Sequence, residues 1–214
     1  MTGRLRSVNV GTPRTVPWHG RDVTSAIWKS PVVGPVRVEG VNLAGDDQAD
    51  RRVHGGTDKA VYAYAAEDYE WWSAELLAEL EPGTFGENLT TEGVEVTGAV
   101  VGARWRVGTA LLEVAQPRMP CAKLGMRMGD AAFRERFGAA RRSGAYLRIV
   151  EPGAVAAGDA IEVVDRPGHG LRVLDIVVAE AEPTTERLER IAAVSDVAEG
   201  WRDWAARALA RSGR

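Results

Sequence analysis

The sequence predicts a mainly β protein with added α-helices, in which a closed barrel or sandwich of short strands is followed by a small three-helix tail. Short apolar stretches with strand-like alternation recur at even spacing and are separated by glycine turns, which is typical of barrels and sandwiches. A compositional break at residues 167–170 precedes three helical patterns. We therefore predict a β-rich domain at residues 1–165 and a three-helix extension at residues 170–214.

The first half of the chain is predicted to contain short strands, one long loop and one helix. Period-2 alternation predicts strands at residues 4–10, 23–28, 36–41 and 60–65. The polar segment 45–59 has neither a helical nor a strand period, and a long structured loop of this kind is usually functional. Apolar residues at three- and four-residue spacings predict an amphipathic helix over residues 67–80, before Pro82-Gly83.

The second half is predicted to alternate strands with short helices and to end in helices only. Strands are predicted at residues 94–96, 99–101, 104–107, 110–115, 145–150 and 160–164. Helical patterns cover residues 124–128, 131–137, 172–180, 185–193 and 198–210. Thr184 or Thr185 is the predicted N-cap of the middle tail helix. Two helical patterns carry a tryptophan pair each, and we expect at least one tryptophan of each pair to pack in the core.

The composition is that of an ordinary soluble globular protein. The chain has 214 residues, and its formal net charge of −3 argues against a broadly basic nucleic-acid-binding surface. A single cysteine excludes an intramolecular disulfide, which fits a reducing compartment. The sequence has neither the apolar run of a signal peptide nor a stretch long enough to span a bilayer. We therefore expect a cytoplasmic protein without membrane or stable nucleic-acid partners.

The only cysteine of the chain, Cys121, stands between two prolines and two cations. It belongs to the segment Gln116-Pro117-Arg118-Met119-Pro120-Cys121-Ala122-Lys123-Leu124. Because proline fixes its own φ and keeps the preceding residue out of the helical region, we expect a stiff, non-regular segment here. Cations near a sulfur favour the thiolate, the form that attacks electrophiles and binds soft metals. A lone cysteine is also often a small buried hydrophobic residue, and both interpretations are open at this point.

The long loop contains His54-Gly55-Gly56, followed by Lys59. Paired glycines let the backbone approach a ligand and turn successive N–H groups toward one point, while neighbouring cations add positive charge. The pattern suits a phosphate, and equally a solvated turn capped by His54. Further along, Asn88 offers an amide that can donate and accept hydrogen bonds at a site, or cap a turn.

Two sharper interpretations of His54 concern Cys121. The histidine could act as general base for the thiol in a thiol hydrolase, or could be a ligand or an orienting group near a metal. A conventional zinc site is not indicated, because the three histidines and the cysteine lack metal-ligand spacing. The cationic pair Arg141-Arg142 lies in another loop, where such pairs are usually solvated.

Taken together, three ordered motifs resemble the MOSC domain, the C-terminal domain of molybdenum-cofactor sulfurases. The first is Gly45-Asp46-x-Gln48-Ala49-Asp50-x-x-x-His54-Gly55-Gly56-x-Asp58-Lys59-Ala60-Val61-Tyr62. The second is Phe85-Gly86-Glu87-Asn88-Leu89, and the third is the cysteine segment. The resemblance extends over residues 5–165, including Gly144-Ala145-Tyr146-Leu147-Arg148 and Gly158-Asp159. The tail resembles the three-helix extension of YiiM-type members of this family.

The resemblance implies a strongly bent, closed β-barrel, similar to the barrel of pyruvate kinase, that binds the molybdenum cofactor. It implies that Cys121 ligates the metal or, alternatively, carries sulfur, and a soft thiolate beside cations suits either role. The residues implied to bind the cofactor are His54, Gly55, Gly56, Lys59, Asn88, Arg118 and Lys123. Amide and cationic donors of this kind suit an anionic phosphate and the edges of a pterin.

The resemblance also implies an activity. YiiM-type proteins are associated with reductive detoxification of N-hydroxylated compounds, including hydroxylaminopurines, which implies a molybdoenzyme that removes oxygen from an N–OH group. No flavin or nicotinamide motif is apparent, so electrons would come from a separate reductase. The tail is a candidate docking surface for it, unless the tail packs on the barrel or on a second subunit of a homodimer. Two alternatives are open: a non-catalytic carrier of cofactor or sulfur, and a Cys–His thiol hydrolase.

Overall fold

The computed structural model describes residues 2–49 and 55–212 of the chain. The strands are β1 (Thr2–Val10), β2 (Arg14–Trp18), β3 (Arg21–Ser25), β4 (Ser30–Pro31), β5 (Val36–Glu39), β6 (Asn42–Leu43), β7 (Val61–Ala65), β8 (Leu89–Glu92), β9 (Arg104–Val107), β10 (Ala110–Pro117), β11 (Ala145–Glu151), β12 (Gly153–Val155) and β13 (Ala160–Asp165). The helices are the 3₁₀-helix η1 (Thr57–Lys59) and the α-helices α2 (Ala66–Leu76), α3 (Ala122–Met128), α4 (Phe133–Ala140), α5 (Val173–Ala181), α6 (Thr185–Ala193) and α7 (Glu199–Ser212). In this part of the chain, no helix is both long and apolar enough to cross a membrane.

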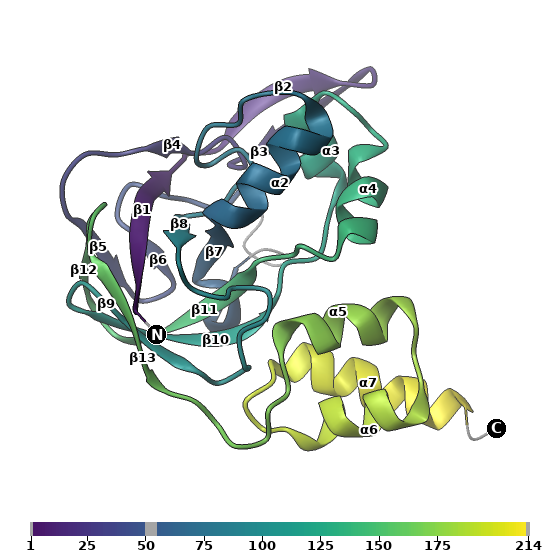
Figure 1. Cartoon of the computed structure of the whole chain (residues 1–214). Coiled ribbons are helices and arrows are strands. Elements are labelled where there is room, and N and C mark those ends of the chain that lie inside the picture. Colours follow the sequence, from purple (N-terminus) through teal and green to yellow (C-terminus); the bar gives the residue numbers. More distant parts are fainter. Residues whose placement is uncertain (1, 50–54, 213–214) are drawn as a thin grey trace.

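Seven strands form a closed, mixed β-barrel in the order β13-β9-β10-β11-β7-β8-β1 (Figure 1). Pairing of β1 with β13 closes the sheet, and within the barrel only β7 and β8 run parallel. Register shifts interrupt β1, β10 and β13, and such irregularities bend strands and increase their twist. The predicted closed and bent barrel is therefore confirmed, and the sandwich alternative is wrong.

Strand β7 is buried on both of its faces, because all five of its residues are buried. Successive side chains of a strand point to opposite faces of the sheet. The small residues Val61, Ala63 and Ala65 accordingly pack in the barrel core, whereas Tyr62 and Tyr64 belong to a separate aromatic cluster outside the barrel. The strand thus joins two hydrophobic cores.

The aromatic cluster fills the space between the barrel wall and the helices α2 and α4. Trp72 of α2 stacks on Phe137 of α4 with ring centroids 5.9 Å apart, and its indole N–H donates to the Tyr64 hydroxyl at 2.8 Å. Aromatic pairs contribute about 0.5–1.5 kcal/mol each beyond the area that they bury. Figure 1 shows α2, α3 and α4 on one side of the barrel and the tail helices on another.

The three tail helices pack onto the barrel and share its hydrophobic core. Leu171 and Ile176 are buried in the same apolar cluster as the barrel strands. Thr184 caps α6, because its hydroxyl accepts a hydrogen bond at 3.3 Å from the backbone N–H three residues later, as predicted. Trp201 and Trp204 of α7 pack against this core, so the expectation for the tryptophan pairs is confirmed.

The two strands predicted at residues 94–96 and 99–101 are wrong. This segment forms bends and turns, and most of its apolar residues are buried next to the beginning of the tail. Its backbone is bonded to that part of the chain: the N–H of Val101 donates to the carbonyl of Leu171, and the N–H of Val173 donates to the carbonyl of Ala99, both at 2.9 Å. The apolar pattern therefore reflects burial against the tail and not pairing within a sheet.

The remaining differences concern short strands and element ends. The sequence pattern does not predict β8 or β12, which are short and carry little alternation. Of the strand predicted at residues 23–28, residues 23–25 belong to β3 of the hairpin β2–β3, whose first strand contains Pro17, whereas residues 26–28 have no regular structure. Helix α2 ends at Leu76, not at residue 80, because Leu77 takes a left-handed conformation with a φ of 52°.

A fully buried carboxyl group, that of Glu87, ties α2 to the turn before β8. Its Oε1 accepts hydrogen bonds from the Tyr69 hydroxyl at 2.6 Å, from the Gly83 N–H at 2.7 Å and from the Thr90 hydroxyl at 2.7 Å. Burial raises the pKa of this carboxyl above its ordinary value, although the hydrogen bonds act in the opposite direction.

Replacing Glu87 by Gln keeps the accepting oxygen and should change how stability depends on pH. A carboxyl with a raised folded-state pKa stabilises the fold fully below its unfolded value of 4.5. This contribution is lost as the pH rises through the folded-state pKa, and it amounts to about 1.4 kcal/mol for each tenfold difference in acidity constant between the folded and unfolded states. The melting temperature of Glu87→Gln should therefore increase relative to the wild type as the pH is raised from 4.5 toward neutrality.

The control is Glu92→Gln, at an exposed pair with Arg4, where the pKa of the carboxyl is lowered by the Arg4 hydrogen bond. Because the pKa of Glu92 is lowered and not raised, its contribution to stability grows with pH, so Glu92→Gln should show no increase in melting temperature relative to the wild type as the pH is raised. A difference in melting temperature between Glu87→Gln and the wild type that stays constant over this pH range would contradict the assignment.

Candidate functional site

A cavity on the outer face of β7 and β11 collects most of the side chains that the sequence analysis identified. Tyr62 and Tyr146 are paired in register on these two strands and line the cavity. The other lining residues come from segments 25–29, 47–49, 85–88 and 118–123 and from the end of η1. The cavity therefore lies where barrel strands meet the loops that connect them.

The thiol of Cys121 lines this cavity and is partly exposed. Strand β10 ends at Pro117, residues 118–121 have no regular structure, and α3 begins at Ala122. The expected non-regular segment is thus confirmed. The carbonyl of Cys121 accepts a hydrogen bond from the N–H of Leu124 at 3.0 Å, which fixes the cysteine at the start of α3.

The guanidinium of Arg118 lines the same cavity although the side chain is almost completely buried, with 5% of the residue exposed. It lies 5.3 Å from the ring centroid of Phe137 and 5.9 Å from that of Tyr62. Its Nη1 has no hydrogen-bond partner among the residues that the structure describes. Because a buried cationic N–H without an acceptor is costly, this atom is a donor prepared for an anionic ligand.

Lys59, Asn88 and Lys123 also line the cavity. Lys59 is the last residue of η1, and burial lowers the pKa of its ammonium group, while the neighbouring carboxylate of Asp58 opposes this shift. The structure thus brings five residues identified from the sequence to one place, including Arg118 and Cys121. Their proximity makes a shared ligand physically feasible.

Gly55 and Gly56 directly precede η1 and are not among the lining residues of the cavity. Gly56 has a φ of 98°, a conformation that glycine adopts without strain. His54 lies outside the described residues, so its distance from Cys121 remains a prediction. Among residues 2–49 and 55–212, no three His, Cys, Asp or Glu side chains gather as a metal site made by the protein alone.

A buried ion pair that sequence reasoning missed supports the cavity wall. Lys29 Nζ pairs with the carboxylate of Asp46, and the two side chains are 9% and 1% exposed. Asp46 Oδ2 also accepts a hydrogen bond from Asn88 Nδ2 at 2.9 Å. The same Nδ2 donates to a backbone carbonyl of β1 at 3.3 Å, and Asn88 Oδ1 accepts from the Tyr62 N–H at 3.1 Å. The Asn88 amide is therefore used inside the protein, where it holds the cavity wall together.

The cavity is cationic. Its described lining residues include four basic side chains, Lys29, Lys59, Arg118 and Lys123, and one acidic side chain, Asp47. Burial lowers the pKa of Lys29, although its partner Asp46 favours the charged form. The other cationic loop takes no part, because Arg141 pairs with Glu182 and Arg142 with Asp68.

The fold and the site define a β-barrel protein whose cationic cavity contains a single, partly exposed thiol. Residues 50–162 match the family model of the MOSC domain, so the chain belongs to the MOSC domain family. The function of this family is associated with the molybdenum cofactor.

The relatives extend the similarity to the whole chain. The protein YflK of Bacillus subtilis is 35% identical over 199 residues, which covers 92% of this chain and 90% of the relative. The protein YiiM of Escherichia coli is 33% identical over 183 residues, covering 84% and 74%. The crystal structure of YiiM from Geobacillus stearothermophilus has a TM-score of 0.80 at 28% identity, covering 97% of this chain and 99% of that one. A protein of Gibberella moniliformis named Reductase is 34% identical over 161 residues, covering 73% of this chain and 28% of its own length.

The residues of the cavity fit the molybdenum cofactor. Cys121, which lines the cavity, would offer a soft sulfur ligand to the metal. The buried Nη1 of Arg118, which has no partner among residues 2–49 and 55–212, would offer a charge-assisted donor to an anionic phosphate or a pterin edge. Lys59 and Lys123 add positive charge on the same cavity. The donor set therefore matches both the metal and the anionic part of this cofactor.

The ion pair between Lys29 and Asp46 yields a stability prediction. Removing one partner of a buried pair leaves the other charge uncompensated, which costs roughly 3–5 kcal/mol. Asp46→Asn should therefore lower the free energy of unfolding by about this amount in urea titrations at neutral pH. The matched control is Glu39→Gln, since the pair Arg37–Glu39 is 62% and 57% exposed and such pairs contribute about 0–1 kcal/mol. Equal losses in the two variants would contradict a buried, supporting role.

Proposed function

We propose that this protein is a reductase that uses the molybdenum cofactor to remove oxygen from N-hydroxylated compounds, such as 6-N-hydroxylaminopurine. One observation carries the proposal: Cys121, the only cysteine of the chain, lines the same cavity as Arg118, whose buried Nη1 has no hydrogen-bond partner in the described part of the chain. The similarity to a protein named Reductase supports an oxidoreductase, and the YiiM-type family supports the choice of substrate.

The cofactor is held by groups from three parts of the chain. Cys121 provides the thiolate ligand of the metal. Arg118, Lys59 and Lys123 bind the anionic phosphate. The backbone N–H groups of Gly55 and Gly56, next to the cavity in sequence, are further candidate donors, and His54, which lies outside the described residues, stays a prediction. Asn88 acts indirectly, because its amide is bonded to Tyr62 and Asp46. When bound, the cofactor supplies the two-electron reduction of the N–O bond.

The substrate is oriented by the apolar part of the cavity. Tyr62, Phe85 and Tyr146 line it, and the partly exposed ring of Tyr146 offers an aromatic surface to a planar heterocycle, whereas Tyr62 and Phe85 are buried. Burial raises the pKa of Tyr62 and of Tyr146, so both phenols stay neutral. The reaction consumes two electrons and two protons, breaks the N–O bond and releases an amine and water. Lys29 Nζ, which Asp46 holds at the cavity, donates a proton to the oxygen that leaves.

The electrons come from a separate reductase. Replacing Cys121 by Ser should abolish reduction of 6-N-hydroxylaminopurine with an artificial electron donor, because the hydroxyl is a poor ligand for a soft site. The protein is produced in a host that makes the cofactor and in one that does not, and metal content and activity are measured for both. We expect molybdenum and activity only from the first host.

The same comparison separates the alternatives. Wild-type protein that contains molybdenum but has no turnover with any N-hydroxylated compound would favour the carrier. Full activity from the cofactor-free host, or retained activity in Cys121→Ser, would contradict the proposal and favour another use of the site.

The role of Arg118 is tested by cofactor retention. Arg118→Gln removes a charge-assisted donor worth about 1.5–3 kcal/mol, so the molybdenum content after dialysis should fall roughly tenfold or more. Arg14→Gln is the matched control, because Arg14 lies over the ring of Trp28, 4.0 Å from its centroid, and is not one of the lining residues. Equal molybdenum retention in Arg118→Gln and the wild type would remove Arg118 from the site.

A further inference from the structure

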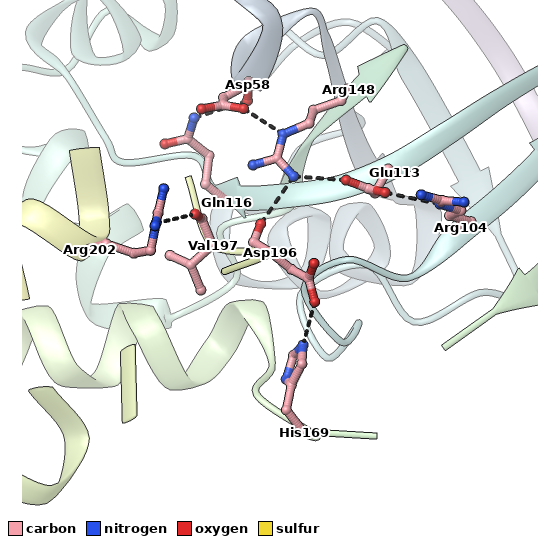
Figure 2. Close-up of polar contacts among 9 residues, drawn as sticks. All are labelled: Asp58, Arg104, Glu113, Gln116, Arg148, His169, Asp196, Val197 and Arg202. Carbon is pink, nitrogen blue, oxygen red and sulfur yellow. Dashed lines mark hydrogen bonds and ion pairs between the residues drawn. The ribbon is translucent and has the colours of Figure 1, made fainter. Parts of the chain in front are cut away.

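A network of polar contacts outside the cavity connects the tail to η1, which carries Lys59 (Figure 2). Arg148 of β11 is at its centre. Its Nε donates to Asp58 Oδ1 at 2.5 Å, and its Nη1 donates to Glu113 Oε1 at 2.8 Å and to the carbonyl of Asp196 at 3.0 Å. One guanidinium therefore joins the 3₁₀-helix, the barrel and the tail.

The barrel part of this network is built by strand register. Glu113 of β10 is paired in register with Arg148 of β11 and with Arg104 of β9, and Arg104 Nε donates to Glu113 Oε2 at 3.0 Å. Burial opposes the charge of Arg148, but Asp58 and Glu113 raise the pKa of its guanidinium above the ordinary value. Arg148 stays charged, and its fork matches several acceptors at once.

A second contact runs in parallel through Gln116. Its Nε2 donates to the backbone carbonyl of Asp58 at 2.9 Å, and its Oε1 accepts the indole N–H of Trp201 at 3.1 Å. Trp201 belongs to α7, so the tail reaches η1 at Asp58 through a side chain and through the backbone. Asp196, the tail residue that Arg148 contacts, is itself held in place, because its Oδ2 lies 3.2 Å from His169 Nε2.

We propose that Asp58, Gln116 and Arg148 are positioning residues that hold η1, and with it Lys59, at the cavity, and that the tail completes this clamp through Asp196 and Trp201. The inference deepens the proposed function, since it rests on Lys59 binding the anionic part of the ligand. None of the three side chains lines the cavity. Their effect on the ligand passes through Lys59, the residue next to Asp58.

The first test is hydrogen–deuterium exchange of the protein without added ligand. Arg148→Lys keeps the charge but replaces the fork by a single ammonium, so η1 should lose its contact. The amide of Lys59, which bonds to the carbonyl of Gly56 at 3.1 Å, is the reporter, and its exchange should accelerate about tenfold or more. Arg104→Lys is the matched control, because Arg104 contacts Glu113 at the end of the network away from η1.

The tail is tested in the same way with Trp201→Phe and its matched control Trp204→Phe. Both lose the same volume, but only Trp201 donates to Gln116. Faster exchange at Lys59 in Arg148→Lys and Trp201→Phe, with wild-type exchange in both controls, is the expected result. Unchanged exchange in the two test variants, or an equal increase in the controls, would overturn the clamp.

The second test asks whether the clamp acts through Lys59, with inorganic phosphate as the probe in calorimetric titrations. Arg148→Lys and Lys59→Ala should each weaken phosphate binding severalfold. In the Lys59→Ala background, Arg148→Lys should have no further effect, because the group that it positions is gone. Additive losses would overturn the positioning role, as would a wild-type protein that does not bind phosphate. If the protein binds phosphate but never acquires molybdenum, the proposed function is contradicted and the clamp is not.

Discussion

The burial of β7 on both faces is the constraint on which the rest of the structure depends. Its small residues fill the barrel, and its tyrosines fill the aromatic cluster outside. A register slip of one residue would exchange these two sets, so the position of the strand is strongly specified. Because only Ala60 separates η1 from β7 and α2 directly follows the strand, β7 also places Lys59 at the cavity and Trp72 in the aromatic cluster. Asn88 strengthens this arrangement, since its side chain accepts the N–H of Tyr62 and its backbone N–H donates to the carbonyl of Tyr62.

The parts of the molecule that could be predicted from the sequence are those with local signals. Prolines and cations surround Cys121 in the sequence itself, and period-2 and helical patterns reveal most of the barrel and the tail. No local sequence signal identifies Lys29. Its role depends on an ion pair with Asp46, which lies in a different loop, and Asp46 in turn accepts a hydrogen bond from the Asn88 amide. The strand predictions within segment 94–101 were wrong for a related reason, since burial against the tail produces the same alternation of apolar residues as a strand does. Contacts made between distant segments decide these cases, and one sequence does not show them.

Two basic groups of the cationic cavity are supported in different ways by the surrounding protein. Lys29 is paired with Asp46, and Arg118 lies against the rings of Phe137 and Tyr62. These supports differ in kind: the first neutralises a charge, whereas the second leaves a guanidinium N–H available. Like charges brought together in one cavity repel each other, and an anionic ligand offsets this repulsion. Ligand binding to the folded state alone also raises its stability, so a site of this type couples occupancy to folding.

The tail belongs physically to the site as well as to the fold. Besides its contacts with Arg148 and Gln116, the tail bonds to segment 94–101, where the N–H of Leu174 donates to the carbonyl of Thr97 at 2.9 Å. The hydroxyl of Thr97 in turn accepts the N–H of Gly144 at 3.0 Å, at the point where β11 begins. Gly144 has a φ of 63°, and a Cβ there would lie 2.5 Å from the carbonyl oxygen of Ala63 in β7. Only glycine allows this close approach, which sets Tyr146 opposite Tyr62 in the cavity. The tail therefore reaches the cavity by two separate routes, one through η1 and one through the start of β11, and its inner face is already occupied by the barrel.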